Sequence, residues 1–267
     1  MPSFVPVNRG SHTGKAWLRY TSYRFAAERP WIPIVAAELA KATLAMPVAF
    51  VEENGALHLV AVMSLEPGKN QFVAPDGRWI GGYIPAALRG YPFALLLPVG
   101  AQEPIMCVDE DSGLIVDAGT PGAELFFDDE GAPAPALKTV LDFLSQVETN
   151  RAATSRAVTT LAAASILMPW LIQVNTPEGP KSVTGLQRID EERLNALDDK
   201  GFLDLRAAGG LAVAYSQLLA LGQLGVFETL AKLQQQISAV HTQQQTAFDR
   251  SFETPASEEL QFDFSRL

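Results

Sequence analysis

The chain has 267 residues, of which 48% are hydrophobic and 19% are charged, and its formal net charge is −10. This composition is typical of a globular protein with a sizeable core and excludes an intrinsically disordered chain. The single Cys107 excludes an internal disulfide and a cysteine-rich zinc site, which favours a reducing compartment, so we expect a cytoplasmic protein. Residues 1–10 lack the basic and apolar regions of a secretion signal.

The apolar runs of the sequence are interrupted by polar residues and by proline. The longest of them, 161–172 and 211–221, are shorter than the ~20 apolar residues that cross a bilayer. We therefore expect no membrane insertion, and we exclude a membrane permease.

Acidic and basic residues are separated along the chain. No basic residue lies between Arg89 and Lys138, a stretch with nine acidic side chains, whereas basic and aromatic residues alternate in the first fifty positions. Cations with aromatic rings can bind nucleic acid, but the negative chain as a whole would repel a polyanion, so we expect no nucleic-acid partner.

Residues 1–45 are interpreted as an irregular arm with a short helix. The aromatic side chains of the arm would contact the body of the protein, and its cations would meet the acidic stretch. Pro30 and Pro33 favour a helix over 34–42, because proline at the first turn loses no intrahelical hydrogen bond.

Residues 46–130 are predicted to be mainly β. Alternating apolar residues at 48–53 and 57–63 flank Asn54-Gly55, a pair that supplies the positive φ angles of a tight hairpin turn. A second turn is predicted at Pro75-Asp76-Gly77. Further strands are expected at 93–97, 104–108 and 114–116, of which the last two are joined by the acidic turn 109–113.

Residues 131–248 are predicted to be helical. A long amphipathic helix begins near Pro135, followed by a strand pair over 171–174 and 183–189 and a small helix that Asp190 caps. Residues 211–245 are helical again, with a bend at glycines 222 and 225.

The last helix has apolar residues at alternating steps of four and three. These are Val226, Leu230, Leu233, Ile237 and Val240. Two uses of this seam are open: intramolecular packing, which we favour, and a homodimer through residues 226–244. The tail, 249–267, resembles a linker followed by a docking strand, in which Leu260, Phe262 and Phe264 alternate with polar residues.

The sequence thus predicts an α+β fold, in which a mainly antiparallel β N-terminal portion packs against long C-terminal helices. The parts are 1–45, 46–130, 131–248 and the tail 249–267, and we expect one compact domain up to about residue 248.

Several separated motifs occur in the order of one known family. They lie at 4–8, 25–28, 81–93, 107–113, 188–191 and 194–197. Together they resemble the bacterial SapC family, and the resemblance covers the chain except for the tail after the last long helix. It implies an accessory role in bacterial surface layers or, by genomic company, with outer-membrane uptake receptors and flavin-dependent halogenases, and it carries over no catalytic residues.

The glycine-, tyrosine- and proline-rich segment 81–93 is the candidate binding site. Its members are Gly81, Gly82, Tyr83, Pro85, Arg89, Tyr91, Pro92 and Phe93. The glycines permit close backbone approach, the tyrosines offer flat surfaces, and the arginine can bind a carboxylate or phosphate. We therefore favour a soluble binding protein for a peptide or protein partner. The alternative is a rigid loop packed on the sheet, with Arg89 bridging to the acidic centre.

A second functional hypothesis is an enzyme in which Asp109 and Asp111 act with Arg89 on a small molecule or peptide. Neither the acidic turn nor the three histidines have the spacing of a metal site, so we interpret the turn as solvated and expect no metal or cofactor. Cys107 is interpreted as a small core residue rather than a nucleophile, because neighbouring carboxylates disfavour its thiolate.

Overall fold

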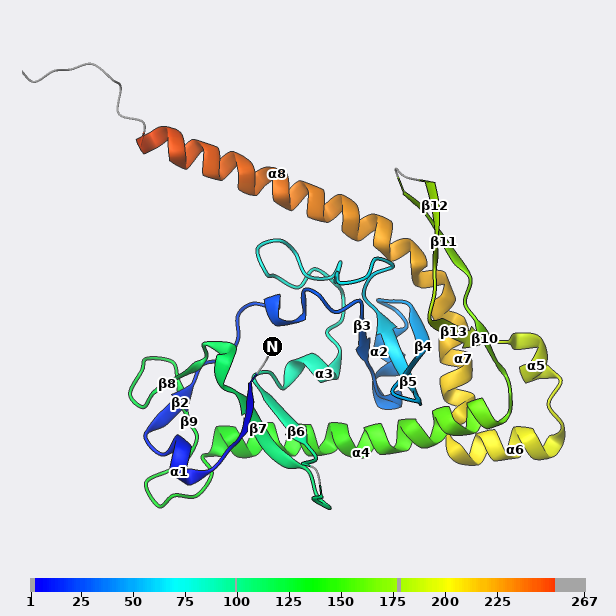
Figure 1. The fold of residues 1–267 in the computed structure, drawn as a ribbon, viewed down its shortest axis with the longest axis horizontal. Coiled ribbons are helices and arrows are strands. Elements are labelled where there is room, and N and C mark those ends of the chain that lie inside the picture. The colour runs from blue at the N-terminus through cyan, green and yellow to red at the C-terminus, as the bar shows by residue number, and fades with distance from the viewer. Residues whose placement is uncertain (1–2, 99, 177–178, 253–267) are drawn as a thin grey trace, which may run out of the picture.

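A computed structural model describes residues 3–98, 100–176 and 179–252. The fold is the predicted mixed α+β class, with antiparallel sheets in the N-terminal half and long helices after them. One helix of 29 residues, α4 (Pro135–Ala163), runs along the molecule from the N-terminal strands at one end to the other helices at the far end (Figure 1).

A five-stranded antiparallel sheet forms the centre, in the order β10-β13-β4-β5-β3. Its strands are β3 (Trp31–Pro33), β4 (Val48–Glu53), β5 (Ala56–Val62), β10 (Leu167–Pro169) and β13 (Leu186–Ile189). The hairpin of β4 and β5 confirms the Asn54-Gly55 prediction, because both turn residues have positive φ angles, 53° and 75°. The turn at Pro75-Asp76-Gly77 is confirmed too, and Gly77 has a φ of 90°.

The arm is more regular than predicted. It contributes β1 (Phe4–Pro6), α1 (Arg9–His12) and β2 (Lys15–Trp17). Strand β1 pairs with β7 (Ile105–Asp109), which also pairs with β6 (Phe93–Leu96), while β2 lies between β8 (Ile115–Asp117) and β9 (Glu124–Leu125). The interpretation as an irregular arm was wrong, because three-residue strands are too short to show alternation and take their partners from residues about a hundred positions away.

The expected contacts of the arm with the acidic stretch are confirmed. The Nζ atom of Lys15 lies 2.7 Å from Oδ1 of Asp117, and the guanidinium of Arg19 lies 2.7 Å from Oε1 of Glu124. Pairs this exposed contribute little stability each, and both lie where β2 and the residues just after it adjoin β8 and β9.

The helix predicted over 34–42 begins two residues later than expected. Helical turns cover η2 (Ala36–Glu38) and α2 (Leu39–Ala42), after the single turn η1 (Arg24–Ala26). Pro33 lies in β3 and not in the first turn of the helix. Strand β3 is at the edge of its sheet, where a residue without an N–H donor is tolerated.

The C-terminal half confirms the predicted long helix and the cap of the small one. After α4 come β11 (Ile172–Thr176), β12 (Gly179–Val183), α5 (Glu191–Asn195), α6 (Asp199–Ala208), α7 (Gly210–Ala220), η4 (Leu221–Gly225) and α8 (Val226–Phe252). The Asp190 side chain accepts a hydrogen bond from the N–H of Arg193. The predicted pairing of 171–174 with 183–189 was wrong in its partner strand, since β11 pairs with β12, whereas β13 pairs with β10 and β4.

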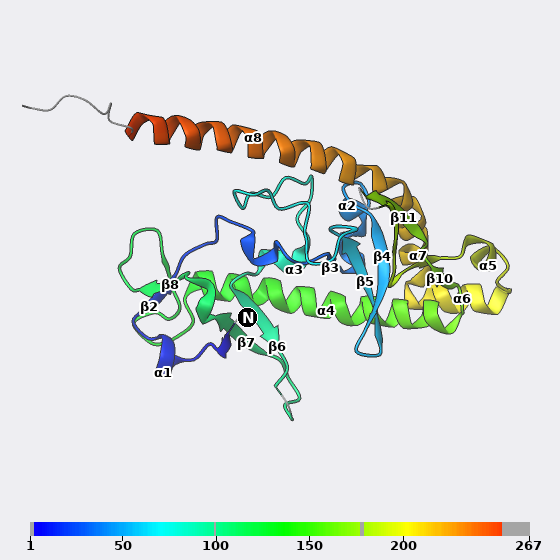
Figure 2. The same cartoon turned by 45° about the horizontal axis from the view of Figure 1, so that its top comes forward.

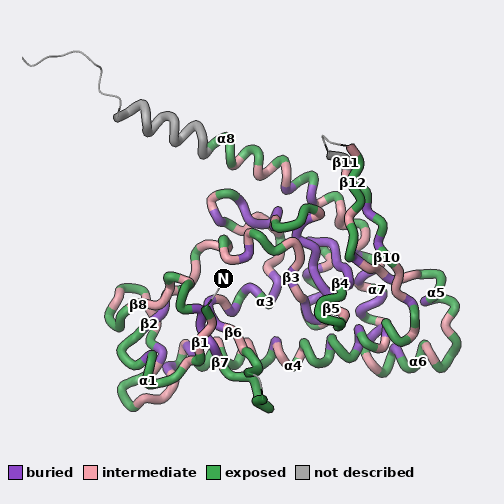
Figure 3. The backbone as a smooth tube through the Cα atoms, in the orientation of Figure 1, coloured by how far each residue is buried: buried purple, intermediate pink, exposed green. Residues whose placement is uncertain are grey.

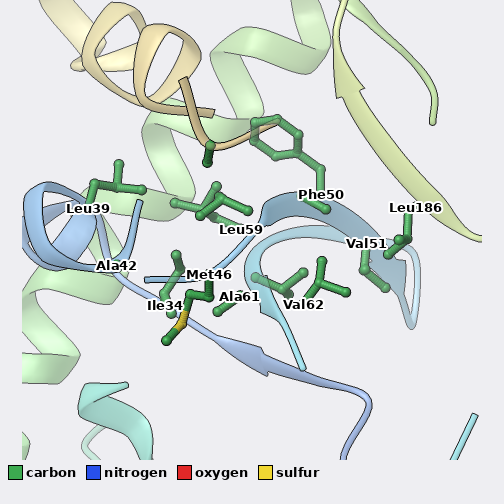
Figure 4. Close-up of a cluster of buried hydrophobic side chains, with 14 of the residues drawn as sticks. Ile34, Leu39, Ala42, Met46, Phe50, Val51, Leu59, Ala61, Val62 and Leu186 are labelled. Atoms are coloured by element: carbon green, nitrogen blue, oxygen red, sulfur yellow. The ribbon is translucent and has the colours of Figure 1, made fainter. Parts of the chain in front are cut away.

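Two large hydrophobic cores lie along α4, and a small third cluster packs its Val147 with Val35 and Ala86. The central core packs both faces of the five-stranded sheet, and Figure 4 shows part of it around Met46, Phe50 and Leu59. Residues of the C-terminal half of α4, among them Leu161, belong to this core, whereas Leu137 near its start belongs to an N-terminal core with Trp17, Phe93, Val108 and Phe126. Figure 3 shows buried backbone concentrated at the sheet and at α7.

The stretch Gly210–Val240, which joins α7 to α8, is apolar and long enough to cross a membrane by length and composition alone. The sequence-based statement that the apolar runs are too short is therefore too strong. Core helices pass the same test, and Phe227 and Leu230 of this stretch are buried in the central core.

The burial of Phe227 and Leu230 confirms intramolecular packing for the first turns of α8, whereas Val240, farther along the helix, is 53% exposed. The homodimer stays a prediction.

Helix α8 continues to Phe252, four residues beyond the expected end of the helical part. The rest of the predicted tail, 253–267, lies outside the described residues.

Replacing Gly55 by valine tests the hairpin. We expect the free energy of unfolding to fall by roughly 1–2 kcal/mol or more, because a β-branched side chain is strained at positive φ. Urea unfolding measures the change. Gly222→Val is the matched control, since both glycines have open space at the Cβ position but only Gly55 has a positive φ. Equal stability of the two variants would contradict the turn assignment.

Candidate binding site

The carboxylate of Glu38 is buried between the sheet and segment 81–93. Its side chain is 7% exposed. Oε1 accepts a hydrogen bond from the N–H of Val35 at 2.9 Å, and Oε2 accepts one from the hydroxyl of Tyr83 at 2.9 Å and one from the N–H of Ala86 at 2.8 Å. Three donors compensate for the lost hydration of this carboxylate, so Glu38 joins η2 to the start of α3 (Ala86–Arg89).

Arg89 is held from the other side of Tyr83. Its Nε donates to the carbonyl oxygen of Ile84 at 2.9 Å, and a terminal N–H donates to the Tyr83 hydroxyl at 2.5 Å. Within the described ranges no acidic side chain forms an ion pair with Arg89. The bridge from Arg89 to the acidic centre, which belonged to the alternative interpretation of segment 81–93, is therefore wrong. Two of the five N–H donors of this guanidinium are used, and the exposed remainder can bind a ligand.

A groove of about 810 Å³ opens beside Arg89. Four segments line it: the arm through Trp17, Arg19, Tyr20 and Tyr23, the segment 89–93, β9 through Glu124, and the first turns of α4 through Thr139, Val140 and Phe143. Its volume lies within the range of roughly 300–1,000 Å³ that is usual for ligand sites. The sheet pairing of β2 and the start of α4 thus bring the arm and segment 89–93 together.

Aromatic contacts hold the walls of this groove. The ring of Tyr20 meets Tyr23 and Phe25 edge to face, with centroids 5.2 and 5.4 Å apart, and Phe25 stacks on Tyr91 at 3.8 Å. These contacts confirm that the aromatic residues of the arm pack on the body. Trp17, which is 4% exposed, has an indole N–H without an acceptor in the described part of the chain, a donor that an added acceptor would stabilise.

The structure divides the eight predicted site residues into three groups. Arg89, Tyr91 and Phe93 line the groove, whereas Tyr83 lies behind Arg89 on Glu38. The other four, Gly81, Gly82, Pro85 and Pro92, do not line it. A Cβ at Gly81 would lie 2.4 Å from Cδ1 of Phe72, so this glycine serves packing.

Sequence reasoning missed the groove residues of the arm and of α4, and also Glu38. The alternation of basic and aromatic residues in the arm was the available signal for Arg19, Tyr20 and Tyr23. Glu38 carries a weaker signal, as the one acidic residue within the apolar run 34–42.

The acidic residues of the enzyme hypothesis lie at a second cleft. Asp109 is buried, and its carboxylate accepts hydrogen bonds from the N–H of Ser3 and the hydroxyl of Tyr91. With Asp111 and Arg29 it lines a cleft of about 490 Å³ that Arg89 does not reach. The structure therefore does not bring Asp109, Asp111 and Arg89 into one site.

Two other observations concern the chemistry of the acidic turn. No group of three or more His, Cys, Asp or Glu side chains in the described ranges could hold a metal ion. Cys107 is buried as expected, and desolvation raises the pKa of its thiol, which keeps it protonated and disfavours a nucleophilic role.

The tyrosines around the groove give a test in alkaline solution. Burial, with a smaller contribution from the neighbouring carboxylates of Glu38 and Asp109, raises the pKa of Tyr83 and of Tyr91 to about 12, and burial also raises the pKa of Tyr20. The unfolded chain releases these protons near the ordinary pKa of 10.0. Stability conferred by the protonated phenols is thus complete below pH 10 and is lost as the pH rises toward about 12.

Phenolate absorbance during a pH titration of the folded protein measures this effect, and urea unfolding across the same pH range measures its consequence. We expect tyrosines that ionise in separate steps and a free energy of unfolding that falls above pH 10. A single titration step near the ordinary pKa for all five tyrosines would contradict the hydrogen-bonded arrangement.

Comparison with known proteins gives one match. The family model described as SapC matches residues 7–226. No curated protein and no solved structure matches the chain. The matched residues include β2, segment 81–93 and the whole of α4, which confirms the resemblance noted from the separated motifs. Because the family model matches residues 7–226, well over half of the chain, the chain belongs to the SapC family.

Proposed function

We propose that this protein is a binding protein that captures a peptide segment of a partner protein in the groove beside Arg89. The observation that carries the proposal is the guanidinium of Arg89, which two hydrogen bonds hold at an aromatic groove while no carboxylate pairs with it in the described part of the chain. An arginine held in this way is suited to a carboxylate on a ligand.

The walls of the groove suit the apolar part of a peptide. Tyr20, Tyr91 and Phe143 offer ring surfaces, and an aromatic or branched side chain between them would lose water-exposed area on binding. The rings of Tyr20 and Tyr91 are already ordered by Phe25, so little side-chain entropy remains to be lost when a ligand binds.

The separation of Arg89 from the acidic cleft favours binding over the acid–base chemistry of the alternative hypothesis. Asp109 uses both carboxylate oxygens inside the fold, on Ser3 and Tyr91. A general base needs to reach the proton that it removes, and a ligand beside Arg89 would lie in a different cleft from Asp109 and Asp111.

Family membership supports an accessory role. SapC proteins are named for a surface-layer gene cluster, and the resemblance links them to bacterial surface arrays and outer-membrane uptake systems. In this proposal the partner is a protein of such a system, captured in the cytoplasm through an exposed peptide segment.

Selection from a displayed random-peptide library, with the full chain as bait, tests the proposal. We expect enriched peptides that carry an acidic residue near an aromatic one. Arg89→Ala should weaken binding of an enriched peptide about tenfold or more, since it removes a charged hydrogen-bonding partner. Its unfolding free energy should change by no more than ~0.5 kcal/mol, because the side chain is exposed.

Arg78→Ala is the matched control. Arg78 is also exposed, but it pairs with Asp76 at 2.7 Å and does not line the groove, so this variant should bind peptides as the parent does. Normal peptide binding by Arg89→Ala, or its unfolding, would remove Arg89 from the proposed site. A library that yields no enriched peptide would contradict the proposed function itself.

A further inference from the structure

We infer that residues 258–264 of this chain occupy the groove beside Arg89 in the same molecule, an inference that rests on the proposed function and names the class of peptide the groove takes. This segment reads Glu258-Glu259-Leu260-Gln261-Phe262-Asp263-Phe264 and lies outside the described residues. The sequence pattern of this segment is that of a docking strand.

The pattern of the segment matches the chemistry of the groove. In an extended peptide, alternate side chains point to the same side, so Leu260, Phe262 and Phe264 would form one apolar face. The three acidic residues of the segment give it a charge of −3 with no basic residue. The apolar face fits against the rings of the groove. Asp263 alternates with the two phenylalanines and points to the other side, so it would meet an exposed cation at the edge of the groove.

The cation that the groove offers is Arg89. The other arginine of the groove, Arg19, already pairs with Glu124 at 2.7 Å. Arg89 is bound only to the hydroxyl of Tyr83 and the carbonyl of Ile84 among the hydrogen bonds of the described residues, and both are neutral acceptors. A carboxylate from the segment would therefore complete the charge balance of the groove.

The path of α8 brings the chain back toward the groove. Helix α8 begins next to α7 and packs on the body through Phe227, Leu230 and Gln234, whose Nε2 donates to the carbonyl oxygens of Gln71 and Val73. It then runs back over the molecule toward the end where β2, β8 and the start of α4 lie, as both views show (Figures 1 and 2).

The lengths of α8 and of the chain after it can be compared with the length of α4. At 1.5 Å per residue, the 27 residues of α8 span about 40 Å, nearly the length of α4, which spans about 44 Å. The twelve residues from Phe252 to Phe264 extend up to about 40 Å more. Helix α8 thus ends on the side of the molecule that holds the groove, and the chain after Phe252 is long enough to extend over a distance close to the length of α4.

Occupation by the chain's own segment would make the groove a regulated site. A partner peptide of the same acidic and aromatic class would have to displace residues 258–264, which lowers its apparent affinity by the fraction of molecules whose groove is open. A linked segment competes at a high effective concentration, so modest intrinsic affinity is enough.

The test uses a fluorescent peptide with the sequence of residues 256–267 and full-length proteins. In one variant, Phe262→Ala, Asp263→Asn and Phe264→Ala are combined to empty the groove. We expect the peptide to bind this triple variant at least about tenfold more tightly than the parent, measured by fluorescence anisotropy. Glu253→Gln is the control, because it removes a tail charge outside the segment and should leave the parent affinity unchanged.

A second comparison locates the peptide. Adding Arg89→Ala to the triple variant should weaken peptide binding about tenfold or more, whereas adding Arg78→Ala should not change it. Unchanged binding after Arg89→Ala would overturn the placement of the segment in this groove.

The remaining outcomes also decide the inference. Equal peptide affinity for parent and triple variant would overturn self-occupancy. Absence of peptide binding to both would overturn the inference as a whole, and the library selection would still decide the proposed function separately. If the difference in peptide affinity between the parent and the triple variant grew with protein concentration, the segment would occupy the groove of a second copy. That result would overturn the inference that it binds within its own molecule.

Discussion

Glu38 accepts three hydrogen bonds in the interior, and through Tyr83 this buried carboxylate determines where Arg89 lies. The order of contacts is Glu38, the Tyr83 hydroxyl and then the guanidinium, so a negative charge in the core and a positive charge at the surface share one phenol. Removal of the carboxylate would leave buried donors at Val35 and Ala86 without acceptors. The candidate site therefore depends on a residue that does not line the groove.

Helix α4 provides the second constraint. Its C-terminal half packs on the five-stranded sheet and its first turns form one wall of the groove, so the two hydrophobic cores share one rigid element. The arm closes the opposite wall, where the strand pairing of β2 and the ion pairs of Lys15 and Arg19 hold it against the acidic stretch. The uneven charge along the sequence thus has a structural use, because it joins segments that are about a hundred residues apart.

Features with a local cause could be predicted from the sequence. Asn54-Gly55 specifies its turn, and Asp190 caps its helix, whatever the rest of the chain does. Strands β1 and β2 could not be predicted, since three residues show no period and their partners lie far along the chain. The site was predicted only in part for the same reason. The side-chain chemistry of Arg89 identified it as a candidate. Its contact with Tyr83, and the contact of Tyr83 with Glu38, are tertiary and have no local sequence signal.

Site-specific photocrosslinking tests most directly whether the groove beside Arg89 holds an acidic and aromatic segment of this chain. A benzophenone amino acid in place of Thr139, an exposed residue of α4 that lines the groove, reports what lies there in the full-length protein. Thr149, exposed farther along the same helix, serves as the control position. We expect mass spectrometry to find an intramolecular crosslink from position 139, but not from 149, to residues 258–264. Crosslinks from position 139 that leave this segment untouched would contradict the account.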